Sequence, residues 1–136
     1  MNRVLVAMDD SREARDALEY ALEQFPNATV YAAHVPEVAN VSFDTSLGAS
    51  MTDEAEDRAE DVLETATTIA GEHGRTIETE LVFGHPAKAM VSYAEENNID
   101  QIIVGSRGRN SVDRLLLGSV AETIIRRANC PVTVVR

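Results

Sequence analysis

Residues 4–11 read Val-Leu-Val-Ala-Met-Asp-Asp-Ser, five apolar residues followed at once by three polar ones. A short strand without polar alternation is buried on both faces, which is typical of a central strand in a parallel sheet. Asp10 and Glu13 have the spacing of a capping box, which marks the start of a helix. The stretch therefore predicts a buried strand that ends at Asp9 and leads directly into a helix.

Strand and helix patterns alternate along the rest of the chain. Further strands are predicted at residues 29–35, 76–83, 102–104 and 132–135, and helices within residues 14–25, 55–70, 86–96 and 120–128. This alternation implies right-handed crossovers and a parallel sheet with helices on both faces. Residues 76–83 alternate apolar and charged side chains, so we expect this strand at an edge. The sequence predicts one α/β domain over residues 1–136, with a doubly wound, Rossmann-like five-stranded sheet.

The loop after the fourth predicted strand contains the strongest chemical signal. In a doubly wound sheet, ligands bind at the carboxyl ends of the strands where the winding reverses. For the strand order 3-2-1-4-5, this place lies between Asp9 and Gly105. Gly105, Gly108 and Gly118 permit a close backbone approach, and a helix that starts at Ser119 attracts anions. The pattern favours phosphate binding, although an ordinary helix cap at Ser119 explains part of it.

The chain is acidic overall, but its charge is unevenly distributed. Asp and Glu number 23 against 12 Lys and Arg, which gives a formal net charge of −11. Residues 1–100 carry 21 acidic and 6 basic residues, whereas residues 101–136 carry 2 acidic and 6 basic residues. The overall charge disfavours nucleic acids and anionic membranes as partners. The basic last quarter favours a small anion, a phosphate above all.

Several classes of protein are disfavoured by what the sequence lacks. No apolar run approaches the ~20 residues of a membrane helix, and the N-terminus has no signal-peptide pattern. Cys130 is the single cysteine, so neither an internal disulfide nor a thiolate metal cluster is expected. No catalytic triad or paired carboxylates are evident, so we predict no catalytic residue and no metal site. We expect a cytoplasmic protein, and the acidic run at residues 53–64 suggests a halophilic cytoplasm.

The glycine pattern, written G-x2-G-x9-G-S, resembles the nucleotide-binding motif of the universal stress protein family. The resemblance extends to VLVAMDDS at residues 4–11, HV at 34–35, GHPAKAMVSYAEENNIDQIIVGSRG at 84–108 and LLLGSVAETIIRRANCPVTVV at 115–135. It implies a five-stranded parallel sheet in the order 3-2-1-4-5. It also implies an adenine nucleotide at the switch point, either ATP, with Mg²⁺ accompanying it, or ADP or AMP.

Carried over by position, the resemblance assigns Asp9 to the ribose or adenine, Val35 to the adenine through its backbone, and Gly105 to the ribose. The phosphates would be held by backbone N–H groups and a hydroxyl from Gly108, Gly118, Ser119 and Val120. Arg107 occupies a variable position of the motif, where its charge suits a phosphate and a solvent-facing arginine is the alternative. Asp10 stands where many relatives have a small residue, which leaves its role open.

The resemblance implies a stress-response protein that binds nucleotide. Two alternatives use the same crevice: a slow ATPase or self-phosphorylating enzyme, and a phosphoacceptor receiver with Asp9 and Asp10 as its acidic pair. The apolar strand at residues 132–135 is predicted at a sheet edge, and together with the resemblance it predicts a homodimer there, beside protein partners that the sequence does not identify. Residues 36–50 are either a lid over the nucleotide or a disordered linker.

Overall fold

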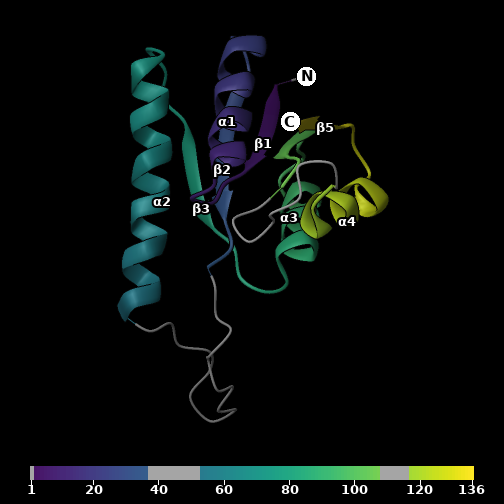
Figure 1. Cartoon of the computed structure of the whole chain (residues 1–136). Helices are drawn as coiled ribbons and strands as arrows, with labels where there is room; N and C mark the ends of the chain where they lie inside the picture. The colour runs from purple at the N-terminus through teal and green to yellow at the C-terminus, as the bar shows by residue number, and fades with distance from the viewer. Residues whose placement is uncertain (1, 37–52, 108–116) are drawn as a thin grey trace.

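The computed structural model describes residues 2–36, 53–107 and 117–136, so most of the predicted lid or linker lies outside the described residues. The elements are β1 (Arg3–Ala7), α1 (Arg12–Gln24), β2 (Thr29–His34), α2 (Asp53–Glu72), β3 (Glu78–Leu81), α3 (Pro86–Glu96), β4 (Gln101–Gly105), α4 (Ser119–Arg127) and β5 (Val132–Val135). The strands form one parallel sheet in the order β3-β2-β1-β4-β5 (Figure 1). The predicted fold class and strand order are therefore confirmed.

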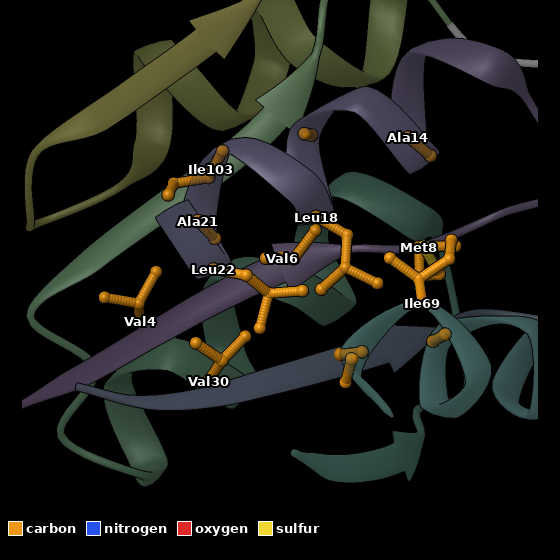
Figure 2. Close-up of a cluster of buried hydrophobic side chains, with 14 of the residues drawn as sticks. Val4, Val6, Met8, Ala14, Leu18, Ala21, Leu22, Val30, Ile69 and Ile103 are labelled. Carbon is orange, nitrogen blue, oxygen red and sulfur yellow. The ribbon is translucent and has the colours of Figure 1, made fainter. Parts of the chain in front are cut away.

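Two apolar layers cover the two faces of the sheet. Along β1, Val4 and Val6 pack in the layer formed with α1 and α2, whereas Leu5 packs in the layer formed with α3 and α4. Figure 2 shows the first layer, where Leu18 of α1 and Ile69 of α2 lie among the side chains of the strands. The three β1 side chains are at most 2% exposed, and each such burial stabilises the fold by ~1.5–3 kcal/mol. Burial of this strand on both faces, as predicted, is confirmed.

The edge strand β3 is shorter than the sequence predicts. It spans Glu78–Leu81 rather than residues 76–83, and it pairs with β2 at one end of the sheet order. After Val82 the chain leaves the sheet, and Gly84 turns it toward α3 with a φ of +122°. A positive φ of this size strains any residue with a Cβ, so glycine is required at this turn. The predicted edge position is confirmed, and α3 begins at the predicted proline.

The start of α1 differs from the prediction. Its N-cap is Ser11, whose Oγ accepts a hydrogen bond from the Ala14 N–H at 3.1 Å. Asp9 Oδ1 accepts the Ser11 N–H at 2.7 Å, and this local turn brings Ser11 into the extended conformation of an N-cap. The predicted capping box of Asp10 and Glu13 is therefore wrong, because the cap lies one residue later.

The long helix α2 carries the acidic run on its solvent side. Seven carboxylates are exposed on it, at Asp53, Glu54, Glu56, Asp57, Glu60, Asp61 and Glu64. Its buried residues form the opposite stripe and pack on the sheet, so the acidic run is a solvated helix face. Among residues 2–36, 53–107 and 117–136, no helix combines the length and the apolar character needed to cross a bilayer.

One arginine joins three segments of the fold. The Arg75 guanidinium donates to the carbonyl oxygens of Leu22 at 2.8 Å, Phe25 at 3.0 Å and Ala28 at 2.6 Å. Leu22 and Phe25 lie at the carboxyl end of α1, where the last carbonyls have no partner within the helix. Arg75 follows α2, so this contact fixes the end of α1 and the approach to β2 against the chain that leads into β3.

We predict that Arg75→Met lowers the free energy of unfolding by about 2 kcal/mol, because the side chain keeps its length but loses its charged donors. Arg58→Met is the matched control, since Arg58 is exposed on α2. It should change stability by less than about 0.5 kcal/mol. Urea denaturation of both variants measures the difference. Equal losses in the two variants would show that the three carbonyl contacts contribute little.

Candidate functional site

The winding of the chain reverses between β1 and β4. These strands are neighbours, with Val6 opposite Ile103, so both carboxyl ends reach the same edge of the sheet. From β1 the chain continues into α1 on one face, and after β4 it reaches α4, which packs on the other face. In doubly wound folds this divergence marks the ligand site. The structure therefore gathers the chain segments that carry the predicted site residues at one edge.

The β1 and β2 ends supply the first part of this edge. Asp9 is half-buried, and its Oδ1 accepts the Ser11 N–H. Val35 follows β2, is half-buried, and packs against the layer under α3 and α4. His34 Nδ1 lies 2.8 Å from the Met8 carbonyl oxygen. A carbonyl can only accept, so Nδ1 carries the hydrogen and this buried histidine joins β1 to β2.

The end of β4 approaches α1 more closely than a side chain would allow. A Cβ at Gly105 would lie 2.8 Å from the Glu13 carbonyl carbon and 2.9 Å from its oxygen. These are backbone atoms of the first turn of α1, so they cannot move aside without shifting the helix. Glycine at this position is therefore explained by the packing of α1 on β4, independently of any ligand.

The same glutamate receives the side chain of Arg107. Arg107 Nη2 lies 2.5 Å from Glu13 Oε1, and the two side chains are 18% and 17% exposed. Charge-assisted hydrogen bonds are about twice as strong as neutral ones, and limited contact with water strengthens them further. The predicted phosphate contact of Arg107 stays a prediction, because the guanidinium is held here by a carboxylate.

The second half of the motif forms the start of α4. Gly118 is the N-cap, and among the described residues no side chain caps the helix. The Gly118 N–H donates to the Ser106 carbonyl at 2.6 Å, and the Ser106 N–H donates to the Val135 carbonyl at 2.8 Å. Ser119 and Val120 begin the helix, and their backbone N–H groups belong to the turn that has no intrahelical acceptor. Gly108 lies outside the described residues.

The structure therefore brings Asp9, Gly105, Arg107, Gly118, Ser119 and Val120 to the edge at β1 and β4, with Val35 on the neighbouring strand. Two further residues of this edge, Glu13 and Ser106, could not be predicted from the sequence. Glu13 has the spacing of a helix cap with Asp10, and nothing in one sequence indicates a contact with Arg107 across 94 positions. Ser106 lies inside the glycine motif, but its contacts are backbone hydrogen bonds. Any residue type can make such bonds, so the sequence does not indicate them.

Two other features of the described residues lie apart from this edge. A shallow hollow of about 360 Å³ is formed by the turn that follows β3 and by α3, with Phe83, Lys88 and Tyr93 in its lining. Within the described ranges, no three His, Cys, Asp or Glu side chains come together as a metal site. Burial raises the pKa of the Cys130 thiol, which agrees with its packing as a small hydrophobic residue.

We predict that Gly105→Ala destabilises the protein by about 1–3 kcal/mol, because the new methyl group overlaps the Glu13 backbone. Gly71→Ala is the control, since nothing lies within 4 Å of a Cβ at that position in α2. The control should be neutral or stabilising by up to about 1 kcal/mol, as Ala is the better helix former. Thermal unfolding of both variants measures the contrast. A Gly105→Ala variant as stable as the wild type would contradict the packing argument.

The chain is similar to known proteins over its whole length. The model of the universal stress protein family matches residues 1–136. Universal stress protein MJ0531 of Methanocaldococcus jannaschii is 32% identical over 139 residues, which cover 98% of this chain and 81% of that protein. Universal stress protein YxiE of Bacillus subtilis is 31% identical over 146 residues, which cover 99% of each.

Solved structures of universal stress proteins have a similar fold. The universal stress protein of Archaeoglobus fulgidus in complex with dAMP has a TM-score of 0.75 and 26% identity, covering 100% of this chain and 98% of that one. A universal stress protein in complex with cAMP has a TM-score of 0.73 and 28% identity, covering 99% and 97%. The family match over the full length, the two relatives and the shared fold lead to one conclusion: this chain belongs to the universal stress protein family.

Proposed function

We propose that this protein is a cytoplasmic stress-response regulator that binds an adenine nucleotide at the edge between β1 and β4. The observation that carries the proposal is the start of α4, where Gly118 provides an N-cap without a side chain. A helix start of this kind presents free N–H groups and the positive end of the helix dipole, which suit a phosphate. The dAMP and cAMP complexes of similar proteins support adenine nucleotides as the ligand class.

A backbone N–H that already donates a hydrogen bond within the protein is not available to a phosphate. The Gly118 N–H donates to the Ser106 carbonyl, so we assign the phosphate to the Ser119 and Val120 N–H groups and the Ser119 hydroxyl. Because Gly118 has no side chain, the space in front of the α4 N-terminus stays open for the phosphate. Gly108 keeps its predicted phosphate role as part of the proposal.

The nucleoside half of the site is assigned to the ends of β1, β2 and β4. Asp9 uses one carboxylate oxygen for the Ser11 N–H, and its second oxygen is suited to accept a ribose hydroxyl. Val35 would meet the adenine through its backbone, and Gly105 would lie beside the ribose. For ATP, Mg²⁺ would be bound by the phosphates rather than by a dedicated set of side chains.

We predict that Gly118→Asp weakens AMP and ATP binding by at least about tenfold, a change of 1.4 kcal/mol. An aspartate at the N-cap places a carboxylate on the same N–H groups and repels the phosphate. The fold should be kept, because aspartate is a favoured N-cap. Isothermal titration measures binding, and the melting temperature monitors folding.

Gly118→Asn is the control, because asparagine has nearly the same size and also caps helices but carries no charge. We expect Gly118→Asn to bind more tightly than Gly118→Asp. Absence of any heat with AMP, ADP or ATP for the wild-type protein would overturn the proposed function.

We also propose that the protein forms a homodimer through β5. The strand ends the sheet order, and Val132–Val135 are half-buried and apolar apart from one threonine. The Pro131 carbonyl accepts a hydrogen bond from Ile102 of β4, and the Val135 carbonyl accepts one from Ser106, directly after β4. Backbone groups alternate sides along a strand, so the Val134 N–H points to the outer edge. An apolar edge of this kind is suited to pair with its copy about a two-fold axis.

We predict that Val134→Pro yields a folded monomer, because proline removes an outward N–H without breaking the ladder to β4. Val134→Thr keeps that N–H and should remain dimeric. Light scattering in concentrated KCl distinguishes a mass of 14.8 kDa from twice that value. The salt is chosen because the acidic surface suggests a halophilic cytoplasm, which stays a prediction. A monomeric wild-type protein at micromolar concentration would refute the β5 dimer.

A further inference from the structure

We propose that Glu13 is a specificity-determining residue, which neutralises Arg107 and thereby makes the site favour nucleotides with few phosphate charges over ATP. This inference rests on the proposed nucleotide site. It goes further, because it assigns a role to a residue outside the glycine motif and makes the preferred phosphate number a consequence of one ion pair.

The contact is a fixed feature of the edge rather than a surface ion pair. Both side chains are more than four-fifths buried, and Nη2 and Oε1 lie 2.5 Å apart. The backbone of Glu13 is held against Gly105, so the carboxylate cannot withdraw with its helix. On the other side, Ser106 is hydrogen-bonded both to β5 and to Gly118, which fixes the chain directly before Arg107.

This fixed pair decides how Arg107 acts on a phosphate. If the guanidinium turned toward a phosphate, it would leave the Glu13 carboxylate poorly solvated and without its partner, an unfavourable state. While the pair stays closed, the two charges cancel, and a phosphate nearby meets a dipole instead of a full positive charge. Arg107 therefore contributes little attraction for a polyphosphate in the wild-type protein.

The position of the pair makes this cancellation relevant to the phosphates. Arg107 follows Ser106, whose carbonyl accepts the N–H of the α4 N-cap. The start of α4, where the phosphate is proposed to bind, is thus tied to the residue next to Arg107. Between the end of β1 and the first residue of α1, the other described charges are the carboxylates Asp9 and Asp10 and the guanidinium of Arg12, which lies 3.8 Å from Asp16 in an ion pair. Arg12 and Arg107 each have a carboxylate partner, so an additional phosphate charge gains little attraction from these two cations.

The test is Glu13→Gln, which keeps the shape of the side chain and an oxygen that accepts from Arg107. Removing the carboxylate charge leaves the guanidinium uncompensated, so affinity should rise with the number of phosphate charges. We expect ATP binding to tighten about fivefold to tenfold and AMP binding to change less than about twofold, as expected for one added charge in partly screened surroundings. Isothermal titration without Mg²⁺, at one fixed ionic strength, gives the ratio of the AMP and ATP dissociation constants.

Two further variants separate selectivity from structural damage. Glu19→Gln makes the same charge change on an exposed position of α1, six residues farther along, and should leave the ratio unchanged. The double variant Glu13→Gln with Arg107→Gln removes both charges, so its ratio should return to that of the wild type. A loss of folding would not reproduce this pattern, because it would weaken AMP and ATP binding equally.

The outcomes distinguish the inference from the proposed function. If the wild type binds nucleotides but Glu13→Gln shifts the ratio no more than Glu19→Gln, Glu13 does not set the selectivity. If Glu13→Gln weakens all nucleotides to the same extent, Glu13 positions the loop, and the electrostatic role is wrong. If neither the wild type nor any variant binds AMP, ADP or ATP, the proposed nucleotide site fails, and this inference fails with it.

Discussion

The approach of Gly105 to the first turn of α1 brings the backbones of two elements so close that no side chain fits between them. A Cβ at Gly105 would stand 2.8 Å from the Glu13 carbonyl carbon. This contact fixes where α1 begins relative to the end of β4, and it thereby fixes the turn at Asp9 and Ser11. The geometry of the whole edge between β1 and β4 depends on it, because each other part is connected to one of these two segments.

Ser106 connects this edge to the rest of the sheet. Its N–H donates to Val135 at the end of β5, and its carbonyl accepts the Gly118 N–H at the start of α4. One peptide segment thus lies between the proposed dimer edge and the proposed phosphate site. These two backbone hydrogen bonds position the start of α4 relative to the end of β5.

Much of the fold could be predicted from local patterns. The all-apolar run at Val4–Met8 indicated a strand buried on both faces, and Pro86 marked the start of a helix, because both signals depend on neighbouring residues. The position of the α1 cap could not be predicted, since it depends on whether Asp9 folds onto the Ser11 N–H. The end of β3 could not be predicted, because the alternation of residues 76–83 fits either the full length or a shorter strand. The observed strand ends at Leu81, before the turn at Gly84.

The charge of the last quarter of the chain shows why site chemistry needs the structure. By sequence, residues 101–136 form a basic segment, which favours a phosphate. In the fold, Arg107 is paired with Glu13, and Arg126 is paired with Glu122 on α4. A formal charge attracts a ligand only when no partner cancels it. The proposed anion preference of this edge therefore rests on the backbone at the start of α4, and Arg107 modifies it according to its carboxylate partner.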